Sequence, residues 1–223
     1  MSIFDDWKAY RDKKQSHWTE KCKVFDEAAM KETIKKNAAE HDLPQTMKAV
    51  EFARILHGTQ WRKTDAESVA YINHPYTLAC HALAMKLYDD DLIASALLHD
   101  VVEDCIADVC DLPAGEKVKH TVELVTFDES GGATRAIAKK KYFEAIYGDA
   151  YAMMVKILDR CHNISCMAFG FRKTKIISYI NETETYIYPM YEQIAKLKPE
   201  WKEAVWLIQY QTVSMVESAK RFV

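Results

Sequence analysis

The chain has 223 residues, of which 49% are hydrophobic and 28% charged, a balance that excludes a disordered chain and is typical of one large globular domain. Thirty basic side chains against 33 acidic ones give a net charge of −3, so no overall positive field favours nucleic acid or an anionic membrane. Only 6 glycines and 5 prolines are present, too few for the frequent turns of a β-sandwich or a β-barrel.

The expected secondary structure is helical along the whole chain. Residues 1–43 contain no glycine or proline, and apolar side chains such as Trp18 and Cys22 recur there at helical spacing. After a loop over 58–73, the triplet Asp89-Asp90-Asp91 should cap a new helix. Helices are expected over 46–56, from Pro75 to the triplet, from the triplet towards Leu112, and over 118–125, 134–147, 150–167, 172–196 and 200–220. The sequence therefore predicts an all-α protein with a helical extension over residues 1–45 and one domain over residues 46–223.

The segment LIASALLHDVVEDC, residues 92–105, places charged groups on a helix whose other residues are mostly apolar. His99 and Glu103 are four residues apart, as are Asp100 and Asp104, so each pair shares a helix face. Burying three acids and a histidine is costly unless they are neutralised, and a divalent cation would neutralise them. The alternative is an exposed acidic edge at the end of the helix.

Two further segments carry candidate groups that are ambiguous by themselves. Lys156, Asp159 and Asn163 share one face of the segment MMVKILDRCHNISC, and taken alone this pattern favours a surface ion pair of Lys156 and Asp159. His57 stands at the end of a helix just before a glycine, a position where histidine commonly stabilises the helix dipole. His74 fits a bracing role at a loop-to-helix junction better than a ligand role.

Taken in order, these groups resemble a known family. The pattern H…HD…D resembles the HD superfamily of metal-dependent phosphohydrolases. Within it, the chain resembles the hydrolase domain of the RelA/SpoT alarmone enzymes and their free-standing small alarmone hydrolases, over roughly residues 46–190. The matching motifs are YINHP at 71–75, LLHDVVED at 97–104, VELVT at 122–126 and VKILDRCHN at 155–163.

The resemblance implies an HD-domain helical bundle and a role for each matching residue. The implied metal ligands are His57, His99, Asp100 and Asp159, a mixed imidazole and carboxylate set that suits Mn²⁺ better than Zn²⁺. Glu103 and Asp104 match the catalytic acidic pair, which would hold and deprotonate a water. The implied substrate contacts are Lys48 near the base, Arg62, Lys63 and Lys156 on the phosphates, and Asn163 on the nucleotide.

The expected activity is the metal-dependent 3′-pyrophosphohydrolysis of (p)ppGpp, which releases pyrophosphate and GDP or GTP. Such an enzyme would oppose a separate alarmone synthetase, and an oligomer is compatible with the sequence. One alternative is an HD phosphohydrolase of another nucleotide, such as ppApp or the 2′-phosphate of NADPH. Another is a catalytically silent nucleotide-binding regulator, against which the intact Glu103 and Asp104 count.

The expected compartment is the cytoplasm. The first residues carry acids ahead of bases and no apolar run, unlike a secretory signal peptide. The six cysteines include no CxxC pair, which favours reduced thiols over a disulfide framework.

Overall fold

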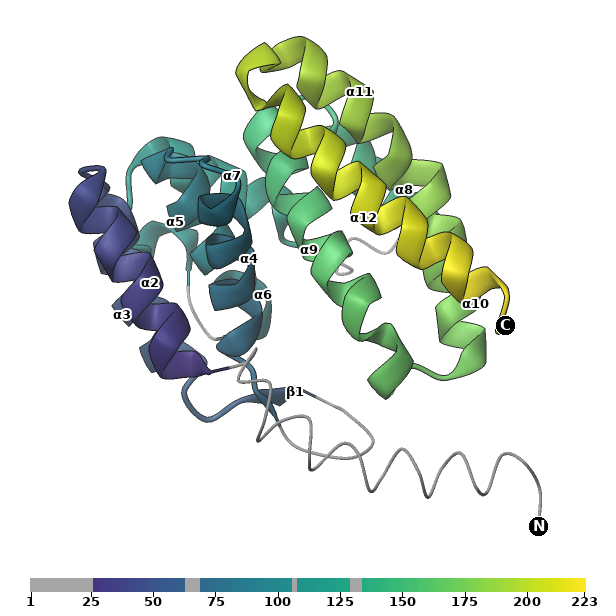
Figure 1. The fold of residues 1–223 in the computed structure, drawn as a ribbon, viewed down its shortest axis with the longest axis horizontal. Coiled ribbons are helices and arrows are strands. Elements are labelled where there is room, and N and C mark those ends of the chain that lie inside the picture. The colour runs from purple at the N-terminus through teal and green to yellow at the C-terminus, as the bar shows by residue number, and fades with distance from the viewer. Residues whose placement is uncertain (1–25, 63–68, 106–107, 129–133) are drawn as a thin grey trace.

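The computed structural model describes residues 26–62, 69–105, 108–128 and 134–223, and within them the all-α prediction is confirmed (Figure 1). The predicted helix around Trp18 and Cys22 lies outside the described residues. The main helices are α2 (Glu27–Glu40), α3 (Pro44–Leu56), α4 (Asn73–Ala84), α5 (Asp90–Leu98), α6 (Val101–Asp104), α7 (Glu116–Val125), α8 (Arg135–Ile146), α9 (Ala150–Gly170), α10 (Lys173–Glu182), α11 (Tyr188–Leu197) and α12 (Lys202–Lys220). Short helical turns occupy Val109–Asp111, Thr183–Ile187 and Pro199–Trp201.

The arrangement of the helices follows from α9, which lies between the two halves of the molecule (Figure 1). On one side α9 packs against α4, α5 and α7, and on the other against α11 and α12. Its segment from Ala152 to Leu158 is almost wholly buried because apolar residues cover most of its circumference. One continuous hydrophobic core joins both halves, and it includes Ile34 and Ala38 of α2.

The aspartate triplet sets the start of two helices. As predicted, Asp89 is the N-cap of α5, where its carboxylate accepts the amide of Leu92 at 3.0 Å. Asp90 also accepts the amides of Gln45 and Thr46, at 2.9 and 2.8 Å, and so caps the first turn of α3 from a different part of the chain. This contact fixes α3 against α5, and with it the chain that leads into the site.

Three local features differ from the sequence expectation. The expected loop over 58–73 contains a two-stranded antiparallel ladder of β1 (Trp61–Arg62) and β2 (Val69–Ala70). The expected continuous helix through HDVVED is interrupted at His99–Asp100, between α5 and α6. The expected helix over 172–196 contains a π-helical turn over Thr183–Ile187, just before Pro189, whose missing N–H disturbs the regular ladder.

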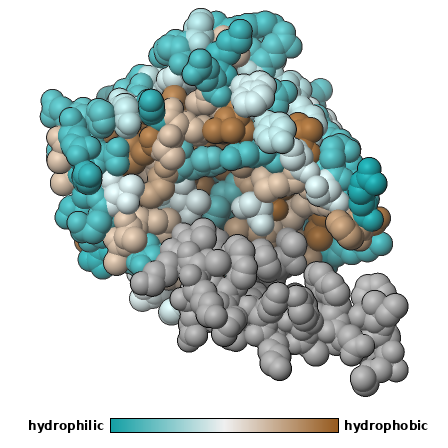
Figure 2. Space-filling view, in the orientation of Figure 1, coloured by the Kyte–Doolittle hydropathy of each residue, from teal (hydrophilic) through white to brown (hydrophobic). Residues whose placement is uncertain are grey.

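Large apolar side chains are exposed on several of the described elements, and α12 holds three of them. Trp206 and Tyr210 are exposed on this helix and stack on each other with ring centroids 5.8 Å apart. Figure 2 shows hydrophobic side chains reaching the surface in the middle of one face, with hydrophilic residues around them. No helix within the described ranges is long and apolar enough to cross a membrane.

Candidate metal-binding site

The interruption between α5 and α6 brings the His99-Asp100 pair to the centre of the molecule. Every residue of α5 from Leu92 to Leu98 is buried, so the helix delivers His99 into the interior at its end. His99 Nδ1 donates to the carbonyl of Ala96 at 2.9 Å. Its Nε2 then lies 3.0 Å from Oδ2 of Asp100.

His74 and Asp159 complete a cluster around this pair. His74 stands in the first turn of α4 and is only 2% exposed, and Asp159 projects from the middle of α9. His74 Nε2 lies 3.2 Å from Oδ1 of Asp159 and 3.5 Å from Oδ2 of Asp100. Ligand atoms of His74, His99 and Asp159 all lie within 4.8 Å of one another, close enough to bind a single ion.

The hydrogen bonds fix which nitrogen of each ring is bare. Because a carbonyl can only accept, His99 carries a proton on Nδ1, so the neutral ring turns an unprotonated Nε2 towards Asp100. The same polarity holds at His57, whose Nδ1 lies 2.7 Å from Oε1 of Gln60, since the amide nitrogen of Gln60 donates to the carbonyl of Asp104. The lone pair of an unprotonated imidazole nitrogen and a carboxylate that faces it repel each other. A proton or a metal cation between the two groups would attract both.

The pKa shifts of the clustered residues are consistent with a site that binds a cation. Burial lowers the pKa of His74, and the neighbouring Asp159 only partly offsets that effect. Burial disfavours the charged form of Asp159, but Lys156, His74 and His99 together outweigh burial and hold the pKa of this carboxyl well below its usual range. The lowered pKa of Asp159 favours the ionised carboxylate and the lowered pKa of His74 the neutral imidazole, the states that metal binding requires, whereas the pKa of His99, despite burial, is raised by Asp100 and Asp159.

His57 lies beside the cluster, at the end of α3. Its Nε2 is buried and has no hydrogen-bond partner among the described residues. The ring packs against Tyr71 at 4.9 Å between centroids, and the Tyr71 hydroxyl donates to Oδ2 of Asp100 at 2.6 Å. Within the described part of the chain, His57 is not one of the three residues whose ligand atoms lie within 4.8 Å of one another. The predicted ligand role of His57 stays a prediction.

The predicted acidic pair lies on α6, one turn beyond Asp100. Glu103 Oε2 accepts the amide of Phe127 at 3.0 Å, and burial raises the pKa of the Glu103 carboxyl. The amide of Asp104 donates to the carbonyl of Asp100 at 2.8 Å, so the pair is tied through the backbone to the cluster. Two carboxylates thus stand beside a candidate cation without being part of the three-residue cluster.

The predicted substrate contacts have different surroundings. Lys156 is 17% exposed and its Nζ lies 3.0 Å from Oδ2 of Asp159, so the pair is largely buried and not a surface pair. Asn163 donates to Oδ1 of Asp159 and accepts from Arg62 Nη2 at 2.5 Å. Lys48 is exposed on α3 and forms no hydrogen bond or ion pair with another described residue. Lys63 lies outside the described residues.

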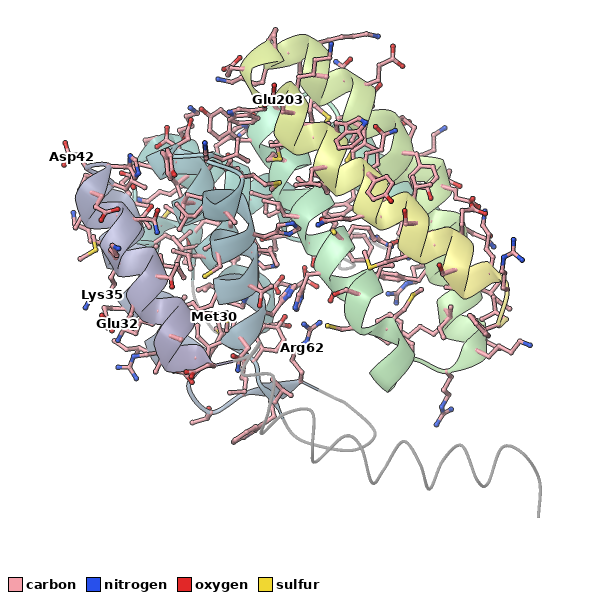
Figure 3. All side chains as sticks on the ribbon, in the orientation of Figure 1. Met30, Glu32, Lys35, Asp42, Arg62 and Glu203 are labelled. Atoms are coloured by element: carbon pink, nitrogen blue, oxygen red, sulfur yellow. The ribbon has the colours of Figure 1, made fainter. Side chains whose placement is uncertain are left out.

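Arg62 enters the site from β1, at the end of the cluster that faces the hairpin. Figure 3 shows it below α6, where the N-terminal helices approach α9. Its Nη1 lies 3.0 Å from Nδ1 of His162. His162 Nδ1 also lies 2.7 Å from Nδ1 of His74.

Sequence reasoning therefore missed three contributors, namely His74, Tyr71 and His162. All three belong to motifs that were recognised, YINHP and DRCHN, but their spacing does not distinguish a ligand from a bracing residue. The available signal was the polar pair Asn73-His74 at the start of α4, whose following residues are mostly apolar.

Comparisons with known proteins give this geometry a context. No family model matches the chain. The mouse protein named guanosine-3′,5′-bis(diphosphate) 3′-pyrophosphohydrolase MESH1 is 32% identical over 144 residues, which span 60% of this chain and 78% of the mouse protein. The human protein of that name matches to the same extent. The bifunctional (p)ppGpp synthase/hydrolase SpoT of Escherichia coli K12 is 27% identical over 206 residues, which span 86% of this chain and 29% of SpoT.

One solved structure supports the fold. It is described by the words "A metazoan ortholog of SpoT hydrolyzes ppGpp and plays a role in starvation responses". It aligns with a TM-score of 0.58 at 22% identity, covering 75% of this chain and 94% of its own. At that identity the likeness concerns the helical architecture alone.

Proposed function

The chain belongs to the family of guanosine-3′,5′-bis(diphosphate) 3′-pyrophosphohydrolases represented by MESH1, and on that premise we propose that it hydrolyses the 3′-pyrophosphate of (p)ppGpp. The products would be pyrophosphate and GDP or GTP. The observation that carries the proposal is the convergence of His74, His99 and Asp159 in a buried site, with the acidic pair of α6 one turn away.

The proposed cofactor is one Mn²⁺ ion bound by His74, His99, Asp100 and Asp159. Mixed nitrogen and oxygen ligands with open positions suit this metal. His57 is the competing source of an imidazole, because its Nε2 is also bare and buried. Paired variants separate the two: His74→Gln should weaken Mn²⁺ binding in a calorimetric titration more than His57→Gln does. The opposite order would favour the ligand set predicted from the sequence, which contains His57 in place of His74.

The chemistry proposed for the site divides between cation and carboxylates. A bound divalent cation lowers the pKa of a coordinated water and offsets negative charge on the attacked phosphate. Glu103 would take the proton of the attacking water on Oε1, since Oε2 accepts the Phe127 amide. Asp104 would orient that water from the adjacent position on α6.

Substrate recognition must rely on local positive charge, because the whole chain is acidic. Lys156 lies beside Asp159 and is the described cation best placed for the cleaved phosphates. Arg62 would reach the same phosphates from β1, Lys63 is the second basic residue proposed to bind them, and Asn163 would contact the nucleotide. Lys48 would act at the base end, and its exposed side chain has no competing partner among the described residues.

The proposed setting is the cytoplasm, where a separate synthetase would make the alarmone. Free thiols at five described cysteines are consistent with a reducing compartment.

An assay of the purified protein with Mn²⁺ against ppGpp, ppApp and NADPH tests the proposal. Release of pyrophosphate from ppGpp at the highest kcat/KM is the expected result. Preferential hydrolysis of ppApp or NADPH would show that the substrate is another nucleotide. No turnover of any of the three would favour a nucleotide-binding regulator.

A further inference from the structure

One arginine side chain connects to two candidate metal ligands at once. Nη1 of Arg62 lies 3.0 Å from Nδ1 of His162, and Nη2 lies 2.5 Å from Oδ1 of Asn163. His162 Nδ1 lies in turn 2.7 Å from Nδ1 of His74, and Nδ2 of Asn163 donates to Oδ1 of Asp159. Each branch of the guanidinium therefore ends, through one intermediate residue, on a ligand.

The polarity of the first branch follows from the chemistry of arginine. A guanidinium has no acceptor, so its contact with His162 requires an unprotonated Nδ1 on that ring. His74 Nδ1, which faces the same atom, must then carry the proton, and its N–H shares the single lone pair of His162 Nδ1 with Arg62. With the proton on Nδ1, the neutral ring of His74 turns a bare Nε2 towards Asp100 and Asp159. One donor thus sets the tautomers of two histidines in series.

The second branch obeys the same rule. Because Arg62 can only donate, the atom of Asn163 that faces it is the carbonyl oxygen. The amide nitrogen of Asn163 is then the atom directed at Asp159. This hydrogen bond holds one oxygen of the carboxylate, while Lys156 holds the other at 3.0 Å.

We propose that Arg62 is a positioning residue of the metal centre, which sets the orientation of His74 through His162 and of Asp159 through Asn163. The inference rests on the metal site of the proposed function and not on the identity of the nucleotide. It differs from a substrate contact in one measurable respect, because it makes Arg62 matter before any nucleotide binds.

Metal affinity measured without nucleotide is the decisive test. The full chain and its Arg62→Ala variant are titrated with Mn²⁺ alone, by calorimetry and by the electron paramagnetic resonance signal of free Mn²⁺. Loss of an outer partner of a metal ligand typically weakens binding about 10- to 100-fold, and we expect a loss of that size. Arg54→Ala, which removes an exposed arginine of α3 paired with Glu51, is the matched control and should bind as the wild type does.

Variants of the intermediate residue separate positioning from general damage. Asparagine presents an oxygen near the position of Nδ1 of histidine, so His162→Asn can still accept the proton of His74. His162→Leu cannot accept it. We expect His162→Asn to retain most of the Mn²⁺ affinity that His162→Leu loses. Equal losses in both variants would overturn the first branch.

Nitrogen-15 spectra of histidine-labelled protein read the tautomers directly. The wild type should show His74 protonated on Nδ1 and His162 bare on Nδ1, and Arg62→Ala should admit the other tautomer of His162. Wild-type Mn²⁺ affinity in Arg62→Ala, or a proton on Nδ1 of His162 in the wild type, would overturn the proposal. If the wild type binds Mn²⁺ normally but does not hydrolyse ppGpp, the proposed substrate is wrong, and the proposed role of Arg62 is not affected. A wild type that binds no Mn²⁺ would overturn both.

Discussion

Glu103 has the surroundings of a general base. Its Oε2 accepts the Phe127 amide, and its carboxyl stands one turn beyond Asp100 without belonging to the three-residue cluster. We expect Glu103→Gln to lower kcat by about 10²- to 10⁴-fold, the usual cost of removing a general base. Mn²⁺ affinity should stay within about twofold of wild type. Asp100→Asn is the contrasting variant, because it should weaken Mn²⁺ binding itself.

The raised pKa of Glu103 predicts the direction of the pH dependence. Burial disfavours the ionised form, so the carboxylate takes up a proton at a higher pH than an ordinary glutamate with a pKa of 4.5. Only the ionised form can accept a proton from water, so kcat should fall as pH drops through this raised value. With saturating Mn²⁺, the fall should disappear from the residual activity of Glu103→Gln. A fall that persists unchanged in this variant would assign it to another group.

At the residue scale, the sequence identified the charged groups but not all of their partners. The HD pair and the acidic pair could be chosen because their spacing on one helix is regular, and Asp159 was chosen through the resemblance of its motif. Choosing between His57 and His74 was not possible from spacing, because each stands at a helix end next to a loop. Which ring reaches Asp159 depends on how α4 packs against α9, and that is a property of the folded chain.

At the scale of elements, Asp90 is a cap supplied from another helix. Its carboxylate accepts the Gln45 and Thr46 amides and the Thr46 hydroxyl, so it replaces the side-chain cap that Leu43 cannot provide. Asp90→Ala should lower the free energy of unfolding by about 1–2 kcal/mol, the range for lost caps. Urea denaturation measures this. Glu116→Ala is the control, since that side chain is 95% exposed and its removal should cost at most a few tenths of a kcal/mol. Equal losses in the two variants would contradict the cap.

The boundaries of elements were predictable wherever a residue forces them. Pro44 begins α3, Gly58 follows its end and the aspartate triplet begins α5 close to the expected positions, whereas α4 ends at Ala84, before the triplet at which its end was expected. The interruption at His99–Asp100 has no such residue, because LLHDVVED is compatible with a continuous helix. The two-residue strands of the hairpin are too short to produce an alternating pattern, so nothing in the sequence distinguished them from a loop.

At the scale of the whole molecule, α2 is part of the main core although it precedes the predicted domain. Ile34 is fully buried in the same core as α9, while Glu32 and Lys35 lie towards the outer side of the helix (Figure 3). Ile34→Ala should therefore cost about 2–5 kcal/mol, the range for truncated core residues. Denaturation followed by fluorescence and by circular dichroism should still give one coincident transition. Glu32→Ala is the exposed control. If Ile34→Ala has the same denaturation midpoint as the wild type, the prediction of a separate extension over residues 1–45 would be favoured.

Neighbouring residues of α9 serve opposite halves of the molecule. Asp159 faces His74, while the next residue, Arg160, is buried against the other half, where it pairs with Glu182 at 2.5 Å and bonds to Thr183. About 100° of helical rotation separates the two residues. Because both are on α9, a displacement of this helix by one half of the molecule also moves the residue that faces the other half. When such domains are recombined, a crossover point inside α9 would separate Asp159, a proposed metal ligand, from the contacts of Arg160 that hold the same helix. Exchanges that keep residues 150–187 from a single parent should yield working hybrids more often.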